Sequence, residues 1–159
     1  MTKPINIALL VFDGIQILDV MGPAAVFGAA NDAIQHPFYR VHVLSPDGGM
    51  INSNSGIAID SRPLKNLAPR SIDTMLISGG GLAKVAAFAA NDTVRKWVLK
   101  ASVFARRYGS ICTGAFALGE FGLITGKRIA THWSTCSELK NSYPEAQVET
   151  NALFVEDGK

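Results

Sequence analysis

Two nearly unbroken apolar runs set the first expectations for this chain. Residues 5–12 and 74–77 are almost entirely apolar, which is typical of strands buried on both faces of a parallel sheet. Residues 39–44 alternate between apolar and polar positions and predict a further strand. Residues 50–60, with Gly56 in the middle, predict a small hairpin. Shorter strands are expected at residues 109–111 and 128–131, with a final strand or hairpin arm at residues 148–155.

Helical spacing of apolar residues is clearest over residues 92–108, where the opposite face carries basic side chains. Asn91 or Asp92 is expected to cap this helix. Shorter helices are predicted over residues 24–27, entered through Pro23 in the first turn, over residues 115–119, and up to Asn141, behind a capping box of Thr135 and Glu138. Strands that alternate with helices predict an α/β fold, a three-layer doubly wound architecture with a mostly parallel sheet.

Composition narrows the class of protein. A chain of 159 residues with 48% hydrophobic residues suits one domain, and we expect residues 1–159 to form it. The net charge of +2 is spread along the chain, which is a weak electrostatic footprint for nucleic acid. The apolar run near the start is far shorter than the ~20 residues of a membrane helix, and no secretory signal follows it. We therefore expect neither a membrane partner nor secretion.

Two further features bear on the compartment and on the extent of the chain. Only two cysteines are present, at unrelated positions, so we expect no disulfide framework and a reducing compartment, the cytoplasm. The sequence ends on Asp157-Gly158-Lys159, a turn with nothing behind it. Because a doubly wound sheet normally has a closing helix over its exposed face, we expect a fragment that is truncated at its carboxyl end.

Ligands of parallel α/β sheets bind beyond the carboxyl ends of the strands, so residues that follow strands are the candidates for chemistry. Asp19 lies a few residues after the first strand, and Cys112 follows the strand at 109–111. Three consecutive glycines, Gly79, Gly80 and Gly81, follow a central strand. These places define one candidate site at one edge of the sheet.

Cys112 is the candidate nucleophile of this site. It lies at a sharp turn from strand to helix, where the amide groups of the following helix favour a thiolate. Gly114 lets that helix pack closely, and the N–H groups of Thr113 and of the glycine loop are candidates for an oxyanion hole. The alternative is that Cys112 is a small buried apolar residue, as free cysteines often are.

Asp19 and His132 are the candidate acid–base groups. Asp19 is placed to share a proton with the Cys112 thiol, because two neighbouring anions repel each other. Its alternative role is a cap for the helix at Pro23. His132 is either a general base in the same crevice or a packed structural residue beside Trp133. The histidines and cysteines have no metal-ligand spacing and the glycines no phosphate-binding pattern, so we expect neither a metal nor a cofactor.

Several segments of the chain, in the expected order, resemble one known family: residues 10–14, 18–27, 44–49, 78–81, 110–116, 122–133, 143–145 and 153–158. They are similar to the ThiJ/PfpI superfamily, whose flavodoxin-like α/β fold is that of the class I glutamine amidotransferases. Within it, the chain resembles the amino-terminal domain of GlxA-like regulators of the AraC family. The resemblance covers most of the chain, so it implies the fold of the whole domain.

The resemblance also implies roles for the candidate residues. Cys112 takes the place of the superfamily's elbow cysteine, Asp19 that of its acidic partner, and the glycines at 79–81 line the same pocket. Thr113 stands where the protease-like branch has a histidine, so a dyad of cysteine and histidine is not expected. Cysteine followed by threonine, with an aspartate at position 19, is instead the arrangement of isonitrile hydratase-like members.

Three functional hypotheses follow. In the first, the chain is regulatory and biases a homodimer when a small metabolite binds beside Cys112 and Asp19, at Gly79, Gly80, Gly81, Thr113, Gly114 and His132. DNA is then bound only through carboxy-terminal helix-turn-helix units, which residues 1–159 do not contain. In the second, Cys112 and Asp19 are catalytic in a cysteine-dependent hydratase. In the third, Cys112 is a redox sensor that is oxidised to sulfenic acid.

Overall fold

The first apolar run forms the centre of the sheet. In the computed structural model, which describes residues 3–159, β1 (Ile5–Leu10) pairs in parallel with β2 (Tyr39–Ser45) on one side and with β5 (Ile72–Ile77) on the other. The side chains of residues 7–11 have no exposed surface. Both faces of β1 are therefore covered, as the unbroken apolar run predicts.

The central sheet of the described chain has six strands in the order β3-β4-β2-β1-β5-β6. Its remaining strands are β3 (Gly49–Asn52), β4 (Ala58–Pro63) and β6 (Arg107–Ser110). The pairs are parallel except for β3 with β4, which form the hairpin predicted over residues 50–60. The mostly parallel sheet expected from the sequence is confirmed.

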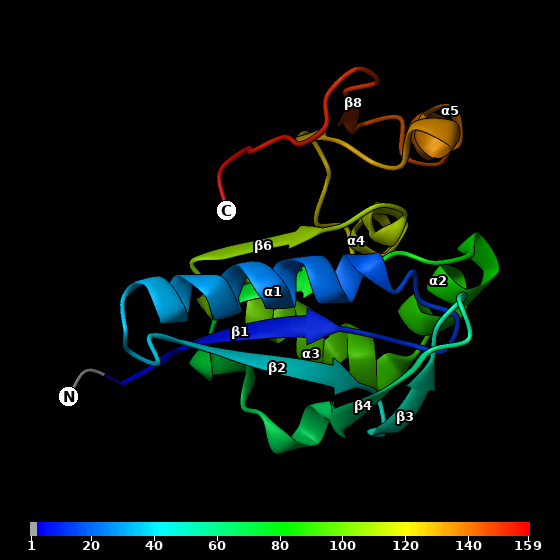
Figure 1. Ribbon diagram of the computed structural model, residues 1–159. Helices are drawn as coiled ribbons and strands as arrows, with labels where there is room; N and C mark the ends of the chain where they lie inside the picture. Colours follow the sequence, from blue (N-terminus) through cyan, green and yellow to red (C-terminus); the bar gives the residue numbers. More distant parts are fainter. Residues whose placement is uncertain (1–2) are drawn as a thin grey trace.

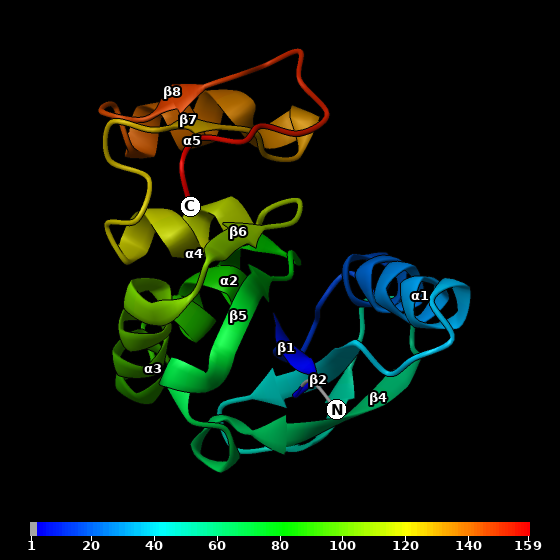
Figure 2. The ribbon, with the colours of Figure 1, turned by 90° about the vertical axis from the view of Figure 1, so that its left-hand side faces the viewer.

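Helices cover both faces of this sheet. They are α1 (Leu18–Ala33), α2 (Leu82–Ala89), α3 (Asp92–Phe104) and α4 (Gly114–Glu120), whereas α5 (Cys136–Ser142) lies away from the sheet (Figures 1 and 2); short 3₁₀ turns are η1 (Leu64–Asn66), η2 (Pro69–Ser71) and η3 (Trp133–Thr135). α1 lies on one face of the sheet, and α2 and α3 lie on the opposite face (Figures 1 and 2). The predicted three-layer α/β architecture is thus confirmed. Within residues 3–159, no helix combines the length and the apolar character needed to cross a membrane.

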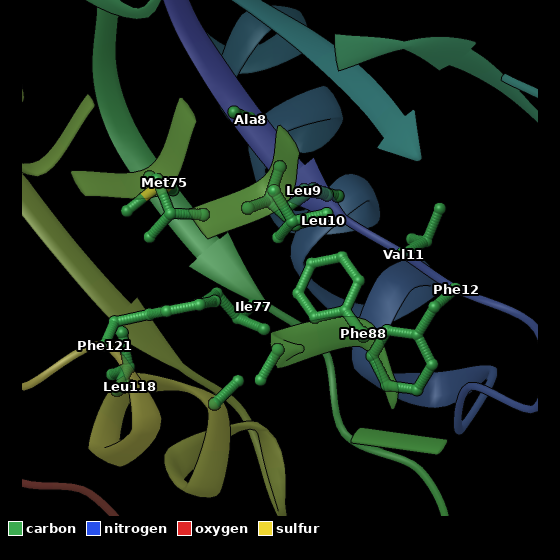
Figure 3. Close-up of a cluster of buried hydrophobic side chains, with 14 of the residues drawn as sticks. Ala8, Leu9, Leu10, Val11, Phe12, Met75, Ile77, Phe88, Leu118 and Phe121 are labelled. Atoms are coloured by element: carbon green, nitrogen blue, oxygen red, sulfur yellow. The ribbon is translucent and has the colours of Figure 1, made fainter. Parts of the chain in front are cut away.

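The core fixes the end of β5, after which the glycine loop begins. Figure 3 shows side chains of β1 and β5 packed with Phe88 of α2 and with Leu118 of α4. The rings of Phe12 and Phe88 lie 5.0 Å apart between centroids. Ile77, the last residue of β5, has no exposed surface, and burial of such a side chain contributes roughly 1.5–3 kcal/mol. The loop at residues 79–81 therefore starts from a rigid point.

A small separate unit lies beyond α4. Its two strands, β7 (Arg128–Ile129) and β8 (Gln147–Val148), pair in parallel with α5 between them in the chain (Figures 1 and 2). The strand predicted at residues 128–131 thus exists but does not join the central sheet. The arm predicted at residues 148–155 is wrong beyond Val148, because in the described part of the chain these residues have no neighbouring strand with which to pair.

The helix that contains Pro23 begins earlier than predicted. α1 starts at Leu18, so Pro23 lies inside the helix and Asp19 belongs to its first turn. The Asp19 carboxylate accepts a hydrogen bond of 2.9 Å from the N–H of Gly79. This contact with a distant loop holds the first turn, so the Asp19 side chain does not act as a helix cap. Pro23 has no N–H, and the carbonyl of Asp19 lacks its usual partner in the helix.

Three other elements differ from the sequence prediction. α3 ends at Phe104, because residues 107 and 108 already belong to β6. Thr135 precedes α5, but its hydroxyl donates to the carbonyl of His132 at 2.9 Å and caps nothing. The sequence pattern predicts no element over α2, although its alanine-rich sequence has good helix propensity.

Asn91 caps α3 as predicted, since its side chain accepts hydrogen bonds from the N–H groups of Thr93 and Val94. We expect Asn91→Ala to lower the free energy of unfolding by about 1 kcal/mol, because two N–H groups of the first turn lose their acceptor. Urea denaturation followed by circular dichroism measures this change. Asn151→Ala, at an exposed position, is the matched control and is expected to change it by less than about 0.5 kcal/mol. Equal changes in the two variants would contradict the capping role.

Candidate functional site

Cys112 lies at the tip of a strained turn between β6 and α4. Its φ angle is 55°, in the left-handed region that residues other than glycine seldom adopt and that costs about 1 kcal/mol or more. The flanking backbone holds it there: the N–H of Ile111 donates to the carbonyl of Ile77, and the N–H of Gly114 donates to the carbonyl of Ile111. The Thr131 hydroxyl also donates to the carbonyl of Cys112 at 3.1 Å. The elbow expected from the sequence is thus present in the backbone.

Gly114 allows α4 to approach the end of β5. A Cβ atom at this position would collide with the carbonyl oxygen of Ile77 and lie 3.0 Å from that of Ser78. Gly114 is itself buried. Its contribution is close packing, as the sequence suggested, and this packing sets the position of the elbow relative to the glycine loop.

Gly79 is the point at which the candidate residues meet. A Cβ atom there would lie 2.8 Å from the Asp19 Oδ2 atom, 2.8 Å from the Cys112 Cβ atom and 2.8 Å from the Thr113 nitrogen. The N–H of Gly79 donates to Asp19, and its carbonyl accepts from the N–H of Gln16 at 2.9 Å. Three segments that are far apart in sequence therefore converge on one residue without a side chain.

Thr113 binds the second glycine of the loop. Its hydroxyl accepts from the N–H of Gly80 at 2.8 Å and donates to the carbonyl of Gly80 at 2.7 Å. The N–H groups of Gly79 and Gly80 are thus both engaged within the protein, and neither is free to stabilise an oxyanion. Gly81 is exposed and precedes α2, and a Cβ atom there would meet nothing within 4 Å. Of the three glycines, two are therefore structural members of the site.

Burial dominates the electrostatics of the acidic pair. It raises the pKa of the Asp19 carboxyl, and the N–H of Gly79 and the charge of His132 offset only part of this rise. Burial also raises the pKa of the Cys112 thiol; the N–H of Thr113 lowers it, whereas the negative charge of Asp19 raises it further. These surroundings favour the neutral thiol over the thiolate that the helix terminus predicts. They also disfavour a redox sensor, which needs an accessible thiolate.

His132 lies at the rim of the site. It is half-buried, and its Nδ1 atom accepts a hydrogen bond from the N–H of Ser134 at 3.3 Å and lies 2.7 Å from the Ser134 hydroxyl. The ring also packs on Trp133, with centroids 5.4 Å apart. Because its charge acts on Asp19, His132 is close enough to the acid to influence it. Its contacts with Ser134 and Trp133 are those of a packed structural residue, and the role of general base stays a prediction.

A cavity of about 310 Å³ adjoins Cys112 on the outer side of β6. Its walls come from β6, from the loop before β7 and from the end of the chain; polar residues among them are Ser110, Lys127, Arg128, Thr131 and Asp157. None of these was a sequence candidate. The usable signal was the hydroxyl of Thr131, the last residue of the strand predicted at 128–131 and just beyond the observed β7. Asp19, the three glycines, Thr113, Gly114 and His132 do not line this cavity.

Over residues 3–159, no group of three or more His, Cys, Asp or Glu side chains is arranged to hold a metal ion. The two cysteines are both free: Cys112 is half-buried, and Cys136 is buried at the start of α5. Cys136 donates weakly to the carbonyl of His132 at 3.7 Å.

Comparison with known sequences places the chain among its relatives. The profile of the DJ-1/PfpI family matches residues 5–159. A protein of Streptomyces lividans, named only as the uncharacterized protein in the cpoL 5' region, is 34% identical over 151 residues, which cover 89% of this chain and 96% of that protein. The transcriptional regulator CdhR of Pseudomonas aeruginosa is 30% identical over 94% of this chain but only 43% of its own length. Isonitrile hydratase of Pseudomonas putida is 28% identical over 82% of this chain and 53% of that enzyme.

Solved structures agree with the fold. A ThiJ/PfpI family protein from Pseudomonas syringae superposes with a TM-score of 0.83 at 24% identity, covering 98% of this chain and 60% of that one. An AraC family transcriptional regulator from Pseudomonas putida gives a TM-score of 0.80 at 17% identity, covering 97% of this chain and 80% of that one. The chain thus spans about two fifths of the sequenced regulators that it matches and a larger share of the solved domains.

The charge of Asp19 is expected to control the Cys112 thiol. Asp19→Asn keeps an acceptor for the N–H of Gly79 and removes the negative charge that raises the pKa of Cys112. The pKa should therefore fall, and alkylation of Cys112 by iodoacetamide near neutral pH should become about threefold faster or more. Mass spectrometry of each cysteine against pH measures the rate. Asp47→Asn, an exposed position, is the control; an unchanged pKa of Cys112 in Asp19→Asn would refute the coupling.

Proposed function

The chain belongs to the DJ-1/PfpI family, and from that premise we propose that it is the ligand-sensing domain of a DNA-binding transcription regulator of the AraC type. A small metabolite binds at the crevice beside Cys112 and Asp19. DNA is bound by a region of the parent protein outside residues 1–159. This division of labour is supported by the regulators that align with nearly the whole of this chain. The aligned region covers less than half of their length.

The observation that carries the proposal is the engagement of the glycine amides. A hydratase that forms an anionic intermediate needs free N–H groups beside the nucleophile. Here Gly79 donates to Asp19 and Gly80 donates to Thr113, and burial favours a neutral Cys112 thiol. An arrangement of satisfied donors around a neutral thiol suits the recognition of a ligand better than the stabilisation of developing charge.

Binding of the metabolite beside Cys112 must then change the conformation of the rest of the protein. We propose that the sensing unit acts as a homodimer in the cytoplasm, and that the ligand shifts the population of two dimer arrangements. Such a shift requires a difference in affinity for the two arrangements. Cys112 is joined through its carbonyl to Thr131 and so to the unit formed by β7, α5 and β8. This unit is the nearest part of the chain that a ligand at the elbow would displace.

A cysteine-dependent hydratase is the second candidate. It is favoured by the sequence similarity to isonitrile hydratase and by the presence of Thr113 and Asp19 beside Cys112. In this role the Cys112 sulfur attacks the isonitrile carbon, the thiol proton passes to Asp19 and then to substrate, and water releases the product as an N-substituted formamide. The N–H of Thr113 is the remaining donor beside the sulfur.

A fractionated bacterial metabolite extract is expected to contain a component that stabilises this chain. At a hundred times its dissociation constant, such a ligand adds about 2.7 kcal/mol to the free energy of unfolding. Gly79→Ala should abolish this gain, because the new Cβ displaces Asp19 or Cys112, whereas Gly28→Ala, in open space on α1, should retain it. Thermal denaturation with and without each fraction measures the effect.

The same preparation distinguishes the two candidates. With an alkyl isonitrile as substrate, hydration is measured as the loss of the isonitrile band from the infrared spectrum. The sensing proposal predicts no turnover above that of Cys112→Ser. Turnover that Cys112→Ser abolishes, without stabilisation by any fraction, would replace the sensor by the hydratase. Asp19→Asn, which preserves the contact with Gly79, serves as a second variant if Gly79→Ala fails to fold.

A further inference from the structure

A second polar cavity lies on the other half of the sheet, three strands away from β6. Its volume is about 470 Å³, within the range of small-molecule sites. Its lining residues are His42 and Leu44 of β2, Arg62 of β4, and Asn66 and Leu67 at the end of η1. This cavity shares no lining residue with the cavity beside Cys112. In Figure 1, β2 and β4 lie below β1, and β6 lies above it.

His42 is held rigidly in the wall of this cavity. Its side chain is only 8% exposed, and its Nε2 atom lies 2.9 Å from the Oδ1 atom of Asn6. The amide of Asn6 is oriented by a second bond, from Nδ2 to the carbonyl of Ser71 at 3.0 Å. Because Oδ1 can only accept, Nε2 must donate, so the neutral ring carries its proton there.

The other ring nitrogen of His42, Nδ1, is available to a ligand. Within residues 3–159 it has no hydrogen-bond partner, yet no fully buried side-chain nitrogen or oxygen is left unpaired, so Nδ1 keeps some exposed surface. His42 is also one of the residues that line the cavity. In the neutral ring Nδ1 is an acceptor, and in the protonated ring it becomes a donor.

The charges around this atom are mainly positive. Arg62 lines the cavity, and Arg40, two residues before His42 on β2, shares its face of the sheet. η1 adds Lys65, and Asp60 on β4 is the acidic neighbour. Burial, then Arg62, then Arg40 lower the pKa of His42. In the described chain neither arginine takes part in an ion pair, so their charge is available to a ligand.

We propose that this cavity binds a small oxyanion, a carboxylate or a phosphoryl-type group, through Arg62, Asn66 and the Nδ1–H of protonated His42. Binding of the anion is coupled to the uptake of one proton from solvent, which protonates Nδ1 of His42 and leaves the anion's own charge unchanged. Without the anion, burial and then the two arginines lower the pKa of His42 and favour the neutral ring. The anion offsets their repulsion, and binding is therefore tighter at low pH than at high pH.

NMR of the histidine Cε1–H resonances tests the proposal, with sodium sulfate and sodium acetate as separate probes and chloride used to hold the ionic strength constant. Neither probe changes its charge between about pH 6 and about pH 8, so any change in affinity reports the protein. The expected result is a raised pKa for His42 with a probe present, and binding up to roughly tenfold tighter per pH unit below pH 7. The resonance of the exposed His36 should not respond to either probe. A response to sulfate or to acetate alone identifies which group the site prefers.

Two matched variants separate a site from general attraction to positive charge. Arg62→Gln should weaken binding about tenfold or more, whereas Arg70→Gln, the same change at an exposed position outside the cavity, should leave it unchanged. Equal loss in both variants, or a His42 resonance that neither probe moves, would overturn the proposal. Because the readout is His42, the result is independent of ligand binding at Cys112.

Discussion

The candidate site depends on the absence of a side chain at Gly79. Gly79 lies in the loop after β5, and the first turn of α1 and the elbow before α4 approach it so closely that a single added carbon would touch both. The hydrogen bond from Gly79 to Asp19 and the paired bonds between Gly80 and Thr113 then join the segments. Gly114 also lacks a side chain, and this allows α4 to pack against the end of β5. Backbone contact, more than side-chain packing, therefore determines the geometry of the site.

This close approach also determines the electrostatics. A carboxyl and a thiol are brought together where little water reaches them, so burial raises the pKa of both, and the negative charge of Asp19 raises the pKa of the Cys112 thiol further. α4 is only seven residues long, and the field of its amino terminus does not outweigh burial. The site is thus rich in polar groups but poor in free charge. Such a site is consistent with the proposed role as a receptor for a small polar molecule.

Local sequence was sufficient where burial or capping is local. The apolar runs predicted β1 and β5, alternation predicted β2, and Asn91 caps α3 as its position before the apolar stripe indicates. Asp19, Cys112 and Thr113 were found because they follow strands and resemble a family pattern, and their convergence on Gly79 follows from the parallel sheet.

What the sequence did not predict depends on contacts between distant segments. α1 begins at Leu18 because Gly79 anchors Asp19, sixty residues away. β7 pairs with β8 and leaves the central sheet, which no local pattern indicates. The cavity beside Cys112 and the one beside His42 are each bounded by elements that meet only in the folded chain. Hydrophobic periodicity describes single helices and strands, so it carries no information about contacts between elements that are distant in sequence.

Pro23 has a mechanical consequence for Asp19. Since proline has no N–H, the carbonyl of Asp19 is not tied to the next turn of α1, whereas the amide and the carboxylate of Asp19 are bonded to Gln16 and Gly79. The acid is thus attached more firmly to the loops than to its own helix. If α1 tilted against the sheet, the helix would bend at Pro23, where this hydrogen bond is missing, and Asp19 would stay beside the elbow. The position of the rest of α1 can therefore change without moving Asp19 away from Cys112.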